Sequence, residues 1–220
     1  MSQVLNQLQS MALFLVALVV SISFHEFCHA WSASELGDST ARNMGRLTLN
    51  PIAHFDPLGA LMILFMAFSG WGIGWGKPVP VNPFNLRPNP RLGMGLTSVA
   101  GPFSNLVLAT LFAIPLRLGL SLPVLLQALL WTMVYTNVGL AIFNLIPLPP
   151  LDGFGVLQGL LATFRTRWAY DWGDKLDRLA PYGPVLLLGL LSLGWFFGLN
   201  LLGRIIGPPM EAILKLLLGS

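Results

Sequence analysis

The chain has 220 residues, of which 55% are hydrophobic and only 10% are charged, and its formal net charge is +3. Its mean hydropathy is +0.71, whereas a water-soluble domain carries about 25% charged residues. This composition indicates an integral membrane protein embedded in a lipid bilayer and leaves no room for a large soluble domain within these residues. The single cysteine, Cys28, excludes an internal disulfide framework, and we expect it to be a packing residue.

The first apolar stretch, residues 11–33, contains the sequence His-Glu-Phe-Cys-His. On a helix, His25 and His29 lie one turn apart and face the same way, so both can bind one Zn²⁺. Glu26 points to another side of that turn, where it can exchange a proton with water. The same motif occurs by chance in helices that bind nothing. Within a membrane span, however, a charged residue costs roughly 2.5 to 3.5 kcal/mol, and a metal ion would offset that cost.

A third ligand is predicted near the end of a later apolar stretch, in the sequence that runs from Asn144 to Gly153 and contains three prolines. Two histidines leave a catalytic zinc one protein ligand short, and the carboxylate of Asp152 would complete the set while leaving a position for water. The alternative is an ordinary Asp-Gly turn in a loop. We therefore expect one Zn²⁺ per chain, although such a ligand set also accepts other divalent ions.

Five apolar stretches and a weaker sixth follow one another along the chain, at residues 11–33, 58–75, 97–120, 122–146, 185–206 and 210–218. If Asp152 joins the histidines, the first and fourth stretches run parallel, so one of the two between them does not cross. The better candidate is 58–75, because it ends in a glycine-rich run and passes into Lys77 to Pro83, a plausible extended strand. We predict an all-α polytopic membrane protein with about four to six transmembrane helices, a re-entrant segment and a short β-strand near the active site.

The basic residues give an independent test of this topology. With 58–75 re-entrant, most of the 12 Lys and Arg residues fall on the side where the site opens, namely Arg42, Arg46, Lys77, Arg87, Arg91, Arg165, Arg167, Lys175 and Arg178. The positive-inside rule makes that side cytoplasmic and places the N-terminus outside.

The motifs together resemble the site-2 protease family of intramembrane zinc metalloproteases. The resemblance covers most of the first 155 residues and rests on His-Glu-Phe-Cys-His, on Ala-Gly-Pro-Phe-Ser-Asn at 100–105, and on the Asn144 to Gly153 sequence, in the family's order. Residues 45–59 and 76–83 are similar to the compact bacterial branch that lacks a PDZ domain. This likeness implies an inner-membrane protein whose zinc ligands are His25, His29 and Asp152.

The same resemblance implies that Glu26 is the general base and that Asn144 holds the scissile carbonyl or oxyanion. It implies membrane-protein or remnant signal-peptide substrates, cut in or near their transmembrane segments, and no nucleic-acid partner. Residues Lys77 to Val81 are expected to pair with the substrate as an edge strand or to form only a structural wall. His54 is interpreted as a gate, a partner of the metal ligands, an occasional fourth ligand, or a residue that merely braces its loop.

Three regions are predicted: a catalytic transmembrane core at 1–155, an amphipathic interfacial segment at 156–182 and C-terminal transmembrane segments at 183–220. The last region serves packing, substrate gating or contact in a homo-oligomer, and the sequence does not choose among these. Asn105 and Asn137 are expected to tie helices together. Two alternatives to the protease are a non-catalytic metal-binding membrane protein and a metal transporter, since histidine and carboxylate pairs also line ion paths.

Overall fold

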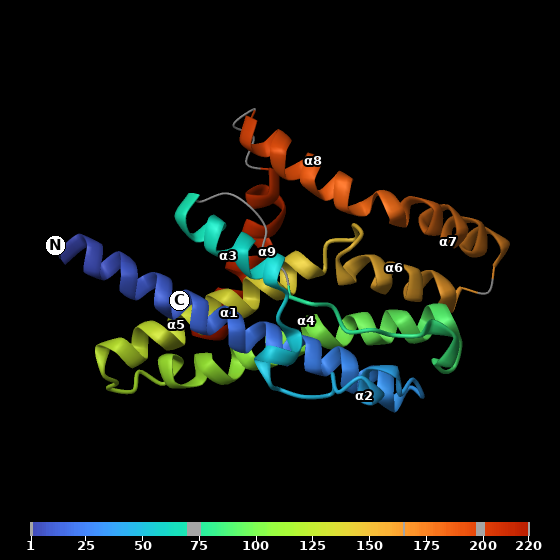
Figure 1. Cartoon of the computed structure of the whole chain (residues 1–220). Coiled ribbons are helices and arrows are strands. Elements are labelled where there is room, and N and C mark those ends of the chain that lie inside the picture. The colour runs from blue at the N-terminus through green and yellow to red at the C-terminus, as the bar shows by residue number, and fades with distance from the viewer. Residues whose placement is uncertain (1, 70–75, 165, 197–200, 220) are drawn as a thin grey trace.

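The computed structural model describes residues 2–69, 76–164, 166–196 and 201–219, and all of its regular secondary structure in these ranges is helical (Figure 1). Its helices are α1 (Ser2–Glu35), α2 (Thr40–Asn43), η1 (Pro51–His54), α3 (Pro57–Ser69), η2 (Pro83–Asn85), α4 (Pro90–Arg117), α5 (Val124–Asn144), α6 (Asp152–Thr163), α7 (Arg167–Leu179), η3 (Ala180–Tyr182), α8 (Gly183–Phe196) and α9 (Leu201–Leu218). The prediction of an all-α fold is confirmed for this part of the chain.

Three helices, α1, α4 and α5, are long and apolar enough to cross a membrane. They pack together in the lower part of Figure 1, and α4 contacts α1, α5 and α6. A bilayer needs about 20 apolar residues per crossing, so these three helices mark the chain as a membrane protein. The predicted four to six spans exceed the three that the described residues contain.

The end of α1 is fixed by local chemistry. Gly37 follows the helix with φ +107°, a conformation that glycine adopts without a steric penalty. The N–H of Gly37 donates to Ser34 O, and the N–H of Asp38 donates to Ala33 O, which is the Schellman pattern of a helix C-terminus. The chain therefore leaves the first span just after His29.

Small residues bring α6 against α4. A Cβ on Gly95 would lie 2.6 Å from the Cα of Gly159, and one on Gly155 would strike the side chain of Ser98. Such contacts let two helix backbones approach more closely than larger side chains allow. Because Asp152 is the first residue of α6, this packing carries its carboxylate toward α1 and α4.

The predicted re-entrant segment and short β-strand are not supported. Helix α3 has 13 residues, about 20 Å, which is less than a bilayer's hydrocarbon core of about 30 Å. The glycine-rich turn predicted after it, at 70–75, lies outside the described residues. No strand is assigned anywhere in the described ranges, and Lys77 to Val81 has no ladder because Pro78 and Pro80 lack N–H groups.

The second half of the chain covers one side of the three long helices. Figure 1 shows α7 and α8 running above α6, and α9 packs on α4 and α5. Arg91 of α4 donates to Asp174 and Asp177 of α7, each at 2.6 Å. The predicted division of the chain into three regions stays a prediction, with α7 inside the segment expected to be interfacial.

Candidate metal centre

The three predicted zinc ligands come together from two helices. The Nε2 atoms of His25 and His29 are 3.0 Å apart. The Asp152 carboxylate lies 3.0 Å from the first through Oδ2 and 3.3 Å from the second through Oδ1. An ion held tetrahedrally about 2.0 to 2.1 Å from each ligand atom separates those atoms by roughly 3.3 Å. The spacing therefore fits one metal ion, as the sequence predicts.

The hydrogen bonds of the two histidines also favour a cation at this point. Nδ1 of His29 donates to the carbonyl oxygen of Thr97 at 2.7 Å, and Nδ1 of His25 donates to Oδ1 of Asn105 at 2.7 Å. A neutral imidazole whose Nδ1 carries the proton presents the lone pair of its Nε2 to the other ring and to the carboxylate. Oδ2 of Asp152 is buried and has no hydrogen-bond partner of acceptable geometry, although it lies close to His25. A bound cation would accept these lone pairs and remove the repulsion between the two Nε2 atoms and the carboxylate.

Gly101 of α4 forms the floor of the site. A Cβ at this position would lie 2.6 Å from both Nε2 and Cε1 of His25 and would also strike Nε2 of His29. The space in front of the two imidazoles is therefore open only because residue 101 has no side chain.

A chain of buried amides fixes the orientation of His25. Nδ2 of Asn105 donates to Ser21 O at 3.2 Å and to Oδ1 of Asn137 at 2.9 Å, which leaves its Oδ1 for His25. Nδ2 of Asn137 in turn donates to Met133 O. The predicted role of Asn105 and Asn137 in joining helices is confirmed. The sequence did not predict that Asn105 also orients His25, and the signal it offered was the place of Asn105 in the motif at 100–105.

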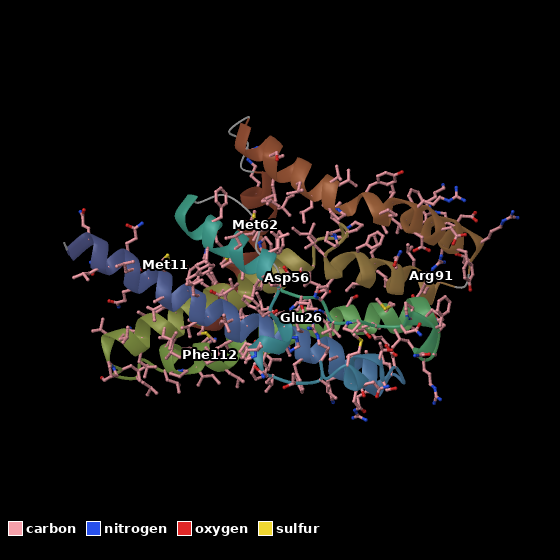
Figure 2. All side chains as sticks on the ribbon, in the orientation of Figure 1. Met11, Glu26, Asp56, Met62, Arg91 and Phe112 are labelled. Carbon is pink, nitrogen blue, oxygen red and sulfur yellow. The ribbon has the colours of Figure 1, made fainter. Side chains whose placement is uncertain are left out.

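Glu26 lies beside the three ligands without belonging to their group. Its Oε2 accepts a hydrogen bond of 3.1 Å from the backbone N–H of Val79. Figure 2 shows Glu26 near the centre of the molecule, below Asp56 and Met62. The carboxylate is thus anchored on one side while it faces the cavity described next.

A cavity of about 580 Å³ opens onto the ligands and is lined by His25, Glu26, Val79, Asn144, Asp152 and Leu187 among others. Asn144, the last residue of α5, donates through Nδ2 to Leu140 O at 2.9 Å. This bond uses one of its two amide hydrogens. The structure therefore brings Asn144 to the same cavity as the ligands and Glu26.

His54 lies away from the ligand group. Its side chain is buried, with 2% exposed, and its Nε2 donates to Thr48 O at 2.8 Å. It lines a second cavity, of about 550 Å³, between α1 and α3. Of the interpretations weighed from the sequence, the bracing of a loop agrees best with these contacts.

Comparison with known proteins agrees with this site. Residues 119–176 match Peptidase family M50. The chain is 40% identical to "Putative zinc metalloprotease YwhC" of Bacillus subtilis (strain 168), over 95% of this chain and 92% of that protein. It is 34% identical to "Putative zinc metalloprotease Rip2" of Mycobacterium tuberculosis (strain ATCC 25618 / H37Rv), over 82% of this chain and 68% of that protein. No solved structure matches the chain.

The size of these matches decides the family. The relative from Bacillus subtilis is matched over nearly the whole length of both proteins, and the His-His-Asp group supplies the ligands that a zinc peptidase needs. The chain therefore belongs to Peptidase family M50, the site-2 protease family, and is a zinc metalloprotease.

Proposed function

We propose that the protein hydrolyses peptide bonds in or beside the transmembrane segments of membrane-protein substrates, with His25, His29 and Asp152 as its zinc ligands. The observation that carries this proposal is the convergence of two Nε2 lone pairs and a carboxylate within 3.3 Å. The helices that hold them, α1 and α6, pack around α4, and α1 and α4 are long and apolar enough to span a bilayer. A site at this place meets substrates that lie in the membrane.

The chemistry follows from the groups that line the cavity. Zinc, when bound, polarises a water molecule and the carbonyl of the scissile bond. Glu26 takes a proton from the attacking water and passes it to the leaving amine. Asn144 donates its second N–H to the negative charge that develops on the carbonyl oxygen. The bond from Val79 N–H keeps the Glu26 carboxylate in one orientation during both proton transfers.

A helical substrate hides its carbonyl groups in its own hydrogen bonds, so it has to unwind before it is cut. The segment from Lys77 to Val81 offers an extended backbone beside Glu26 for an unwound substrate to bind. The N–H of Lys77 donates to His54 O at 2.9 Å, so the chain returns beside the start of α3.

We further propose that the cavity opens toward the cytoplasm of a bacterial inner membrane. Most of the basic residues lie on the side of the molecule where α1 and α5 end near the ligands, including Arg42 in α2, Arg46 in the loop after it and Arg91 at the start of α4. Lys and Arg accumulate on the cytoplasmic side of membrane proteins. Membrane-anchored regulators and remnant signal peptides are the expected substrates.

The first test is cleavage of a panel of single-span membrane peptides by the purified protein in detergent, with zinc content measured alongside. Glu26→Gln keeps the ligands and removes the base, so we expect it to retain one zinc and to lose cleavage by at least about 10²-fold. A wild-type protein that binds zinc and cuts no peptide in or near a transmembrane segment, across the whole panel, would contradict the proposed substrate class.

A further inference from the structure

Arg46 is a buried cation that ties three backbone carbonyls together. Its side chain is 7% exposed. Nη1 donates to Ala53 O, and Nη2 donates to Lys77 O at 2.6 Å and to Pro78 O at 3.1 Å. These carbonyls belong to two segments, one just before α3 and one after it. A single guanidinium therefore joins both ends of the excursion that contains α3.

The charge of Arg46 is compensated by carbonyl dipoles alone. Within the described ranges, no carboxylate lies at ion-pair distance from its guanidinium; the ion pairs found there involve His25, His29 and Arg91. Its Nε is buried and has no hydrogen-bond partner. Hydrogen bonds that involve a charged group contribute about 1.5 to 3 kcal/mol, so the guanidinium holds the two segments firmly together.

The segment after α3 whose carbonyls Arg46 binds also contacts Glu26. Val79 follows the two residues whose carbonyls Arg46 binds, and its N–H donates to Glu26 Oε2 at 3.1 Å. Pro78 has no N–H, so Val79 supplies the first backbone donor after Lys77. The segment is thus fixed between the Arg46 guanidinium and the Glu26 carboxylate.

We propose that Arg46 is a positioning residue, which holds Lys77 to Val79 in place so that Val79 N–H orients the carboxylate of Glu26 for proton transfer. This inference rests on the proposed peptidase activity. None of these three contacts of Arg46 involves a proposed zinc ligand, so its loss should leave metal binding intact. A displacement of about 1 Å in a reacting group costs about 10²-fold in rate.

The experiment compares Arg46→Gln and Arg46→Lys with the wild type in the full-length protein. Zinc content, kcat and KM are measured on a peptide that the wild type cuts, and deuterium uptake is measured on the fragment that covers residues 76–86. Its three prolines leave eight exchanging amides in this fragment, of which three, those of Lys77, Val79 and Val81, lie in the segment 77–81.

Arg117→Gln is the matched control. Arg117 also donates to backbone carbonyls, those of Leu216 and Leu217, but it ties the end of α4 to the end of α9. We expect this variant to keep wild-type kcat and wild-type uptake at 76–86.

For Arg46→Gln we expect unchanged zinc, a kcat lower by roughly 10- to 100-fold, and faster deuterium uptake at 76–86. KM should rise as well, because the loosened segment is the one proposed to bind the substrate. Arg46→Lys keeps the charge but replaces the two donating nitrogens of the guanidinium with one ammonium nitrogen, so its kcat should lie between those of the wild type and Arg46→Gln. Wild-type kcat in Arg46→Gln, or a fall in kcat matched by an equal loss of zinc, would overturn the proposal. If Arg46→Gln fails to fold, the same readouts on Arg46→Lys decide.

Failure of the proposed function has a different signature. In that case the wild type binds zinc and cuts no peptide, and deuterium uptake alone decides the role of Arg46. Faster exchange at 76–86 in the Arg46 variants then supports the proposal that Arg46 holds this segment in place, whereas unchanged exchange overturns it.

Discussion

At the scale of single residues, the metal centre depends as much on an absent side chain as on the ligands. Gly101 faces both imidazoles from α4, and a Cβ there would meet Nε2 and Cε1 of His25 at 2.6 Å. Neither ring can retreat freely, because each Nδ1 is held by a hydrogen bond of 2.7 Å to α4 itself. A methyl group at position 101 would therefore occupy the space where a cation has to sit.

We predict that Gly101→Ala abolishes zinc binding without unfolding the protein. Alanine favours a helix over glycine by about 1 kcal/mol, so α4 should form as before. Bound zinc, measured by elemental analysis of the purified protein, should fall below about a tenth of the wild-type value, and peptidase activity should fall with it.

Gly139→Ala is the control for this change. Gly139 lies in α5, and a Cβ there would meet only Met210 Cε, at 3.9 Å. The Gly139→Ala protein should therefore keep its zinc. A Gly101→Ala protein that binds a full equivalent of zinc would show that the metal lies elsewhere.

The residues of this site differ in how far the sequence predicts them. His25, Glu26 and His29 can be predicted from the sequence because a helix fixes their relative directions. Asp152 can be predicted because the two histidines require a third ligand. Gly101 and the orientation of His25 by Asn105 depend on which face of α4 meets α1. That choice is made by packing between helices distant in sequence, so the motif at 100–105, which contains both residues, does not reveal their roles.

At the scale of elements, Asp38 fastens the end of α1 to the loop before α4. Its carboxylate accepts hydrogen bonds from Asn82 N at 2.7 Å, Asn85 Nδ2 at 2.9 Å and both N and Oγ1 of Thr40. Burial acts to raise the pKa of Asp38, but the bonds from Thr40, Asn85 and Asn82 outweigh it, so the pKa lies below its ordinary value. The ionised form is thus the one that the fold stabilises.

We predict that Asp38→Asn lowers the free energy of unfolding by about 1.5 to 3 kcal/mol at pH 7, the usual range for hydrogen bonds to a charged group. Because the folded-state pKa is depressed, the contribution of Asp38 is complete above its unfolded pKa and is lost as the pH falls below about 4. Measured by denaturation in detergent, the difference in the free energy of unfolding between variant and wild type should therefore be large at pH 7 and smaller near pH 3.

Asp171→Asn, at an exposed position of α7, controls for the loss of one negative charge and should match the wild type at both pH values. A difference between Asp38→Asn and the wild type that grows in acid would contradict this account.

Elements with a strong compositional signal are predicted well and the others poorly. The apolar stretches at 11–33, 97–120 and 122–146 became α1, α4 and α5. The segment from Lys77 to Val81 was predicted to be a strand, yet its backbone groups bind Arg46 and Glu26 rather than another strand. Composition identifies an extended chain, but the partners of its hydrogen bonds are set by tertiary contacts.

At the scale of the whole molecule, the ends of α1 and α5 that meet at the ligands define one face, and the turn between α4 and α5 defines the other. Phe84 is exposed in the loop before α4, and Leu120 is exposed in that turn. If the proposed orientation holds, the first residue lies in the cytoplasm and the second outside.

We predict opposite labelling of cysteines at these two positions in a Cys28→Ser background. Leu120→Cys should react with a membrane-impermeant maleimide on intact cells, whereas Phe84→Cys should react only after permeabilisation. The reverse pattern would place the cavity on the outer side, and equal labelling of both in intact cells would contradict their separation by a bilayer.

The order of the ligands along the chain has a consequence for how the enzyme is made. The histidine pair is synthesised in α1, and Asp152 emerges only after α4 and α5, which are the other two helices long enough to span the membrane. A growing chain therefore inserts its first span with two imidazoles and the Glu26 carboxylate still lacking their partners. If the proposed ligands and substrates are right, metal capture and peptidase activity can begin only when α6 has docked on α4, so the ribosome completes most of the protein before any membrane neighbour is at risk of being cut.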